Sequence, residues 1–186
     1  MGKNIEIEAK FLIQKKDFLK LEEALNLFIK DGWEQINEYF DTPNNDISSS
    51  KSMLRIRTID GKRRELTIKR PLTNGLEETN VDLSERQYQE FIKIGHIDLL
   101  DLGKYQLQKQ GELRTIRNSK PYLDGEIFLD ENHYQGIIDY EIEYEVQTSL
   151  ERAQEQLKEL FRRIGITDYK VSISKYKRCL EAIKNK

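Results

Sequence analysis

Residues 4–13 read Asn-Ile-Glu-Ile-Glu-Ala-Lys-Phe-Leu-Ile, and apolar and polar side chains alternate along this stretch up to Lys10. Because successive side chains of a β-strand point to opposite faces, we expect a strand with two different faces. One face carries the apolar side chains of Ile5, Ile7, Ala9, Phe11 and Ile13, and the other carries Glu6, Glu8 and Lys10. For this strand considered alone, a sheet with one buried and one solvated face explains the pattern.

The same alternation recurs along the chain and predicts about eight strands. Beyond the first, we expect strands at residues 33–41, 53–59, 63–69, 76–82, 112–118, 126–130 and 137–146, with a last strand or turn at 170–174. The dipeptide Asp60-Gly61 is typical of the tight turn of a β-hairpin, and Asp124-Gly125 repeats that signal.

Apolar residues three and four positions apart predict amphipathic helices between the strands. They are expected at residues 15–30, from the N-cap Ser84 to about residue 94, at 97–110 before Gly111, from the N-cap Ser149 to 164, and at the C-terminus around Tyr176, Leu180 and Ile183. Since strands and helices do not alternate in a regular βαβ order, the predicted class is α+β with a mainly antiparallel sheet. The helices would cover the apolar side of that sheet.

The composition bounds the kind of protein. A chain of 186 residues fits a single domain spanning residues 1–186. Its 31 Lys and Arg against 33 Asp and Glu give a net charge of −2, which offers no bulk attraction to nucleic acid or to an anionic membrane. Cys179 is the single cysteine, so no intrachain disulfide can form, and no run approaches the roughly 20 apolar residues of a membrane span. With no apolar leader at the N-terminus, we expect a soluble cytoplasmic protein.

The charged faces of the predicted strands suggest an enclosed site. Charged side chains recur opposite the apolar positions, namely Glu6, Glu8, Arg55, Arg57, Lys69, Glu78, Arg117, Glu141, Glu143 and Glu145. An antiparallel sheet of about eight strands can close into a barrel, and if helices cover its apolar face, the charged face lines the lumen. Clustered carboxylates suit Mg²⁺ or Mn²⁺ and separate cations suit phosphate oxygens, so the pattern indicates a site for a metal-bound polyphosphate. The alternative is a solvated face on which water and salt screen the like charges.

Several motifs, in this order along the chain, resemble the CYTH superfamily, also called the triphosphate tunnel metalloenzymes. The hallmark Glu-x-Glu-x-Lys corresponds to residues 6–10, and further matches are Tyr39-Phe40-Asp41-Thr42, Leu54-Arg55-Ile56-Arg57, Leu66-Thr67-Ile68-Lys69, Glu78-Thr79-Asn80, Arg117, Leu129-Asp130, the acids of residues 141–145 and Ser174-Lys175-Tyr176. The likeness covers nearly the whole chain and is greatest to the single-domain bacterial members. It implies an eight-stranded antiparallel closed β-barrel, or tunnel, with a charged lumen and helices packed outside.

The resemblance also implies roles for individual side chains. Binding of Mg²⁺ or Mn²⁺ would fall to Glu6, Glu8, Glu141, Glu143 and Glu145, and triphosphate binding to Lys10, Arg55, Arg57, Lys69, Arg117 and Lys175. The catalytic set would be Glu6, Glu8, Lys10 and Glu143. The expected reaction is hydrolysis of the terminal phosphate of inorganic tripolyphosphate or of a nucleoside or organic triphosphate.

Three other activities stay open. Family members that act as class IV-type adenylate cyclases usually carry His-Phe before the first motif, where this chain has only Met1-Gly2-Lys3-Asn4. A thiamine triphosphatase would stack its substrate on an aromatic ring, which Trp33 could supply, although one tryptophan here is more often a packed strand residue. A binding module would hold polyphosphate or a nucleotide without turnover. In each case we expect a triphosphate-containing small molecule as partner, with no nucleic acid and no membrane, and a homodimer stays open.

A few conspicuous residues are expected to have other roles. His96 and His133 fall in no metal-ligand spacing and are predicted to be surface or structural residues, and Cys179 is predicted to be an inert buried thiol. Asp41 and Asp130 match family positions, and either could stabilise a turn or pair with a cation of the lumen.

Overall fold

A nine-stranded antiparallel sheet dominates the residues that the computed structural model describes, which are 2–72 and 75–185. Its strands are β1 (Gly2–Ile13), β2 (Trp33–Asp41), β3 (Met53–Ile59), β4 (Arg63–Leu72), β5 (Gly75–Leu83), β6 (Gln108–Tyr122), β7 (Gly125–Tyr134), β8 (Ile137–Val146) and β9 (Tyr169–Val171). In the sheet they follow the order β5-β4-β3-β2-β6-β7-β8-β1-β9. The predicted α+β class and large antiparallel sheet are confirmed, and the short β9 realises the last strand or turn expected near residue 170.

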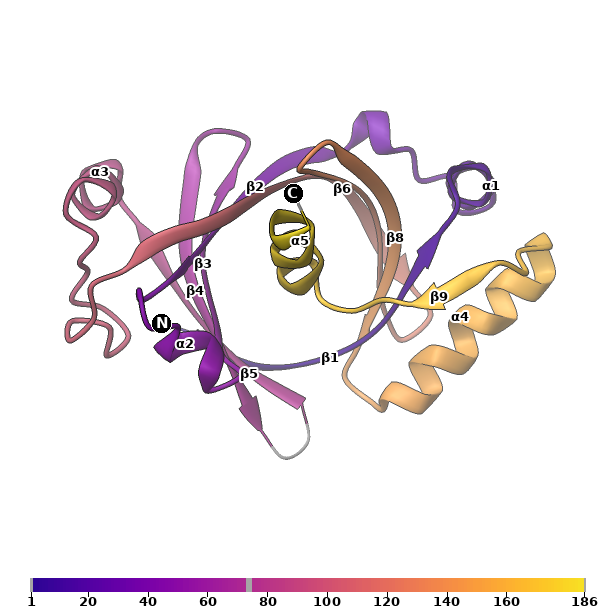
Figure 1. Ribbon diagram of the computed structural model, residues 1–186. Helices are drawn as coiled ribbons and strands as arrows, with labels where there is room; N and C mark the ends of the chain where they lie inside the picture. Colours follow the sequence, from indigo (N-terminus) through magenta and orange to yellow (C-terminus); the bar gives the residue numbers. More distant parts are fainter. Residues whose placement is uncertain (1, 73–74, 186) are drawn as a thin grey trace.

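Strand β1 connects the two sides of the sheet. Its residues 7–13 pair with β8 and its residues 2–6 pair with β5, while β9 pairs with its C-terminal end. Figure 1 shows the result as strands that curve around a ring, with β1 along its lower side. The side chains of residues 2–6 lie outside the description, so Glu6 is placed only by its backbone, which lies opposite Leu76 of β5.

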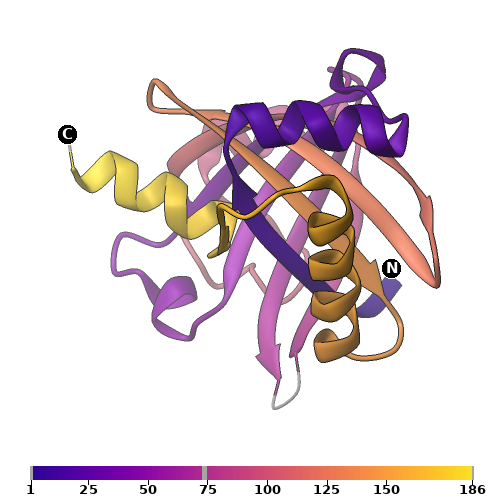
Figure 2. The ribbon, with the colours of Figure 1, turned by 90° about the vertical axis from the view of Figure 1, so that its right-hand side faces the viewer.

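The apolar face of the sheet lies outside the ring, beneath helices. Helices α1 (Lys15–Leu25) and α4 (Leu150–Ile164) pack over β1, β7 and β8 in one hydrophobic core, and Figure 2 shows both in front of the strands. Phe11 of β1, Leu21 of α1 and Phe161 of α4 are each at most 1% exposed. The N-cap Ser149 and Gly165, whose φ of 72° is left-handed, set the predicted bounds of α4. The buried apolar face predicted for the first strand is therefore confirmed where side chains are described.

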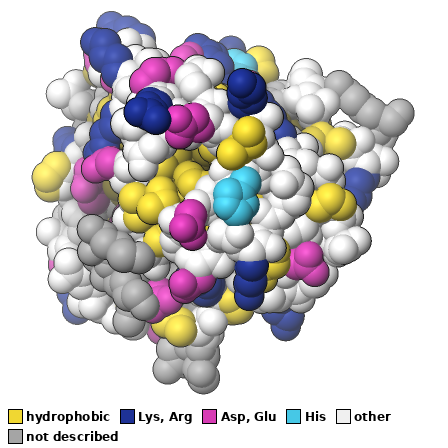
Figure 3. Space-filling model, turned by 90° about the vertical axis from the view of Figure 1, so that its left-hand side faces the viewer, with side chains coloured by type: hydrophobic (Ala, Val, Ile, Leu, Met, Phe, Trp, Pro, Cys, Tyr) yellow, Lys and Arg dark blue, Asp and Glu magenta, His cyan; other side chains and the backbone are white. Residues whose placement is uncertain are grey.

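A second hydrophobic core lies beneath α3 (Glu85–Ile94). Ser84 caps this helix, because its hydroxyl accepts a hydrogen bond from the Gln87 backbone N–H while the Gln87 side chain accepts one from the Ser84 N–H. Phe91 of α3 is buried in this core, whereas Ile92 and Ile94 are exposed. The space-filling view of this side shows hydrophobic side chains interspersed with charged ones (Figure 3).

The helix predicted over residues 97–110 is wrong. This segment forms turns, and β6 already begins at residue 108. Leu100 and Asp101 have φ angles of 54° and 61°, in the left-handed region that a right-handed helix excludes. The apolar spacing has another cause, since Leu100, Leu102 and Leu107 are buried in the core beneath α3.

The helix predicted over residues 15–30 is divided in two. α1 ends at Leu25, because Asn26 adopts a left-handed φ of 46°. The short 3-10 helix η1 (Ile29–Asp31) follows. The Glu22 carboxylate accepts a hydrogen bond from the Ile29 backbone N–H at 2.5 Å and joins the two pieces. No helix within the described ranges is both long and apolar enough to cross a membrane.

Helix α5 (Lys175–Lys184) corrects the expectation that all helices pack outside. It lies at the centre of the ring in Figure 1, and its C-terminal end projects away from the sheet in Figure 2. Its buried residues are Arg178, which is charged, and Cys179, which belongs to a hydrophobic cluster. Polar and apolar contacts therefore both hold the helix inside the ring. Gly111 does not end a helix but lies within β6, where an added Cβ would be 2.7 Å from Cδ1 of Ile183 and 3.2 Å from Sγ of Cys179. Absence of a side chain at residue 111 lets α5 approach β6.

Candidate active site

The inward faces of the strands and the start of α5 surround a cavity of about 220 Å³. Most of the predicted site residues line it, namely Glu8, Lys10, Arg55, Arg57, Lys69, Arg117, Glu143, Glu145 and Lys175. Glu141 is not among the lining residues, and the side chain of Glu6 is outside the description. The structure thus gathers these predicted side chains from five strands and one helix around a single charged cavity.

The register of the strands explains why charges distant in sequence meet there. Lys10 lies opposite Glu143, and Glu8 lies opposite Glu145, in the antiparallel pairing of β1 with β8. Directly opposed residues point to the same side of a sheet, so the charged row of the first strand and the acidic row of β8 share the inward face. Lys10 also pairs with Glu8 along its own strand.

Three basic side chains, Arg55 and Arg57 of β3 and Lys69 of β4, form one side of the cavity, which we call the cationic wall. The Glu78 carboxylate lies 2.5 Å from Nζ of Lys69 and 3.9 Å from Nη2 of Arg55. Arg57 donates from Nε to Oδ1 of Asn37 at 2.9 Å and forms no ion pair within the described residues. Burial, with the neighbouring charge of Arg55, lowers the pKa of Arg57 to about 9. The like charges of Arg55 and Arg57, side by side in this wall, favour an anion.

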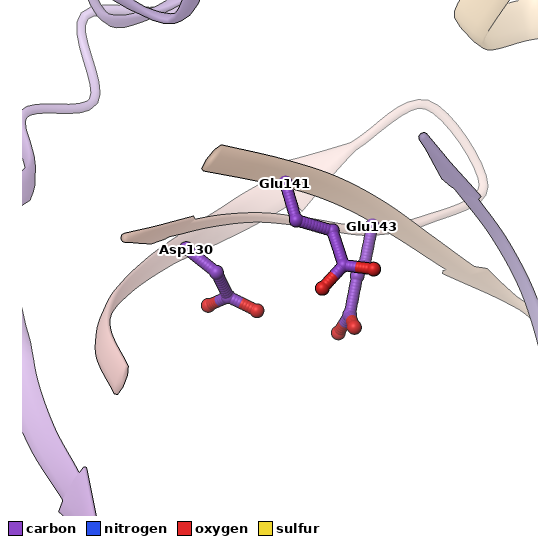
Figure 4. Close-up of side chains that lie close together, drawn as sticks. All are labelled: Asp130, Glu141 and Glu143. Carbon is purple, nitrogen blue, oxygen red and sulfur yellow. The ribbon is translucent and has the colours of Figure 1, made fainter. Parts of the chain in front are cut away.

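Next to the cavity, Asp130 of β7 and Glu141 and Glu143 of β8 form an acidic trio whose carboxylates point into the same space (Figure 4), and of the three only Glu143 lines the cavity. One oxygen from each lies within 4.8 Å of the others. Nζ of Lys175 lies 2.8 Å from Asp130, 2.7 Å from Glu141 and 2.5 Å from Glu143. Arg117 donates from Nε to Asp130 at 2.7 Å and also pairs with Glu143. The trio is therefore buried but matched by cations of the protein itself.

Ion pairing overrides burial in this cluster. Burial alone would raise the pKa of Glu143, but Lys175, Arg117 and Lys10 outweigh it and hold that pKa well below its ordinary value. Burial alone would lower the pKa of Lys175, but the three carboxylates raise it far above its ordinary value. Both side chains are therefore charged at neutral pH.

Arg178 of α5 binds Glu141 from the side away from the cavity. Its guanidinium donates two hydrogen bonds to the Glu141 carboxylate, at 3.1 and 3.0 Å, and two to Asp139, at 3.0 and 3.3 Å. Glu141 has no exposed surface, so these contacts tie α5 to β8. Neither Arg178 nor Asp139 is among the site residues predicted from the sequence. The available signal was the spacing of Arg178 three residues after Lys175, which places both on one side of a helix.

The other residues noted in the sequence lie at separate positions in the structure. Asp41 accepts hydrogen bonds from three backbone N–H groups in the turn that leads into α2 (Asp46–Ser49), so it stabilises a turn, whereas Asp130 pairs with lumen cations. Trp33 begins β2 and does not line the cavity. His96 is exposed, and His133 contacts Glu131 at 2.7 Å, as a surface or structural residue would. Cys179 is buried as predicted, and burial raises the pKa of its thiol to about 11.

Comparison with known proteins identifies the family. A model of the CYTH domain matches residues 4–172. YjbK of Bacillus subtilis (strain 168), provisionally named a triphosphatase, is 38% identical over 151 residues, which cover 78% of this chain and 79% of YjbK. A Bacillus halodurans protein provisionally described as an adenylate cyclase superposes with a TM-score of 0.84 at 35% identity, covering 96% of this chain and 98% of its own. HpAC1 from Hippeastrum, an adenylyl cyclase candidate described as having a dominant triphosphatase activity, superposes with a TM-score of 0.77 at 25% identity, covering 96% of both chains. The chain therefore belongs to the CYTH domain family.

Proposed function

We propose that the protein is a metal-dependent triphosphatase that removes the terminal phosphate of inorganic tripolyphosphate, or of a nucleoside or organic triphosphate, inside a tunnel enclosed by β1 to β8. The observation that carries this proposal is that the cationic wall and the carboxylates of Glu8, Glu143 and Glu145 line one cavity. The names of YjbK and HpAC1 agree with a hydrolase acting on triphosphates.

The basic side chains are suited to holding the triphosphate. Arg57 forms no ion pair among the described residues, and Nε of Arg55 is buried there without a hydrogen-bond partner. Buried donors of this kind are costly unless a ligand satisfies them. Phosphate oxygens would do so, since guanidinium groups bind them in a planar fork and Lys69 adds a point charge. Lys10, Arg117 and Lys175 would complete the binding set.

The carboxylates fit a hard divalent cation. Glu8 of β1 and Glu143 and Glu145 of β8 offer only oxygen donors from neighbouring strands, which is the donor type that Mg²⁺ and Mn²⁺ prefer. Glu6 and Glu141 would complete the proposed ligand set. A cation bound there would supply positive charge to the oxygens of the transferred phosphoryl group.

The side chains of the chain would then direct hydrolysis. Glu143, ionised because of its cationic neighbours, would accept a hydrogen bond from a water molecule and orient it towards the terminal phosphorus. The water oxygen forms a bond to that phosphorus while the bond to the bridging oxygen breaks, and the shortened phosphate chain leaves with the electron pair. Lys10 and the cationic wall would hold the phosphate oxygens in line throughout. Glu6 and Glu8 complete the proposed catalytic set.

An adenylate cyclase is the second candidate, favoured by the description of the Bacillus halodurans neighbour. A thiamine triphosphatase has less support, because Trp33 lies away from the cavity and the aromatic residues that line it are Tyr39 and Tyr176. A binding module would need the cationic wall but not the carboxylates.

A direct assay separates these activities. Purified protein with Mg²⁺ or Mn²⁺ is given tripolyphosphate, ATP, GTP or thiamine triphosphate, and both orthophosphate and cyclic nucleotide are measured. We expect orthophosphate release, reduced at least 100-fold by Glu8→Gln and unchanged by Glu23→Gln, a control on the exposed face of α1. Cyclic AMP as the main product would overturn the hydrolase, and tight binding without turnover would identify a binding module.

A further inference from the structure

Lys175 fills the position in the acidic trio where a metal ion would otherwise be expected. Its ammonium group lies 2.5 to 2.8 Å from one oxygen each of Asp130, Glu141 and Glu143, so all three of its N–H donors have a carboxylate partner. Those carboxylates also provide the oxygens that lie within 4.8 Å of one another. Within the described residues, a cation-binding arrangement of acids is thus already occupied by a side chain.

The position of Lys175 in α5 shows that the carboxylates hold it there. Lys175 is the first residue of the helix, after the N-cap Ser174, and the first turn contains no acidic residue. A positive charge at a helix N-terminus opposes the partial positive charge of the helix dipole. The helix therefore gains nothing from a lysine at this position, and the stabilisation comes from the trio.

Of Arg117, Arg178 and Lys175, the side chain of Lys175 is the one that a competing cation can most easily displace from the trio. Arg117 is held by two hydrogen bonds to Asp130 and lies 4.6 Å from the centre of the Phe128 ring. Arg178 makes two bonds to Glu141 and does not line the cavity. Lys175 lines the cavity and ends in a compact group on a flexible stem.

We propose that Lys175 is an internal counter-cation that competes with divalent metal for the carboxylates of Asp130, Glu141 and Glu143. Mg²⁺ binds carboxylate oxygens at about 2.0–2.1 Å, so an ion placed between these three oxygens would occupy the space of the ammonium group that lies 2.5 to 2.8 Å from them. The proposal rests on the proposed function only in treating this cavity as the metal and triphosphate site. A displaced Lys175 would face the cavity, where the oxygens of a triphosphate offer new partners. Metal and triphosphate would then each favour binding of the other.

Metal binding without substrate tests the competition. Mn²⁺ affinity and stoichiometry are measured by electron paramagnetic resonance and calorimetry for wild type, Lys175→Met and Lys177→Met. Lys177 is exposed on the same turn of α5 and is the matched control. We expect Lys175→Met to bind Mn²⁺ at least tenfold more tightly or to bind one additional ion, and Lys177→Met to match wild type. Identical Mn²⁺ binding by all three proteins would overturn the proposal.

A measurement on the wild-type protein covers the case in which Lys175→Met fails to fold. The buried, fully bonded ammonium group should give a protected lysine ¹⁵N–¹H signal, and titration with Mg²⁺ should shift or remove it. A signal unchanged at saturating Mg²⁺ would overturn the competition. If the protein binds Mn²⁺ as expected but hydrolyses no triphosphate, only the proposed function fails.

Discussion

At the scale of single residues, the charge of Arg57 is expected to lower the stability of the folded protein and to raise its affinity for tripolyphosphate. It is a partly buried cation without an ion pair among the described residues, next to the like charge of Arg55. Arg57→Met keeps an apolar stem but removes that charge, so we expect the free energy of unfolding to rise by about 1–2 kcal/mol. The affinity for tripolyphosphate should fall at least tenfold. Urea denaturation and calorimetry measure the two effects, and a less stable variant with unchanged affinity would contradict the interpretation of the cationic wall.

Glu78 should make stability depend on acid pH. Burial alone would raise its pKa, but Arg55 and Lys69 lower it from 4.5 to about 2. A depressed carboxyl pKa stabilises the folded state above the unfolded value, and this contribution disappears as the pH falls from 4.5 towards 2. Glu78→Gln should therefore cost about 3 kcal/mol at pH 7, because it removes the carboxylate charge that pairs with Arg55 and Lys69. Urea titrations at several pH values should show the difference from wild type shrinking through that window, whereas a constant difference would count against the ion pair.

At the scale of elements, the attachment of α5 depends on Arg178. Arg178→Met removes the bonds to Glu141 and Asp139 and leaves Lys175 as the remaining cation at the fully buried Glu141, so we expect a loss of about 3–5 kcal/mol in the free energy of unfolding. The amides of α5 should also lose protection from hydrogen exchange. Arg162→Met is the control, since its pair with Glu159 is exposed and should contribute less than about 1 kcal/mol. Equal protection of α5 in both variants would show that apolar contacts alone hold the helix.

The elements also show what the sequence can and cannot predict. Strand positions follow from a period of two, which is a local property, and the caps Ser84 and Ser149 are local signals as well. The loop at residues 97–107 repeats helical spacing because tertiary burial selects the same apolar residues. The place of α5 depends on Arg178 meeting Glu141 across 37 positions of sequence, and periodicity carries no such information.

At the scale of the whole molecule, the charged inward face of the sheet was predictable from the sequence. The pairing of each cation with a carboxylate on that face was not. Once β1 and β8 are strands, the parity of their residues places Glu8, Lys10 and Glu143 on one face. Which cation neutralises which carboxylate depends on distances across the ring. The net charge of −2 likewise conceals the cationic wall, because opposite charges elsewhere in the chain cancel it.

This separation of charge predicts that an anion alone stabilises the protein. In the absence of divalent metal, tripolyphosphate can neutralise the cationic wall, and a ligand that binds only the folded state at 100 times its Kd adds about 2.7 kcal/mol. For a chain of this size, each kcal/mol raises Tm by roughly 2–4 °C. Thermal denaturation with EDTA should therefore show a rise of about 5–10 °C with tripolyphosphate, and a smaller rise with orthophosphate at the same concentration, because one phosphate reaches fewer of the cations. The rise should be reduced in Arg57→Met and retained in Arg162→Met. An equal rise in wild type and Arg57→Met would show that the anion binds outside the cavity.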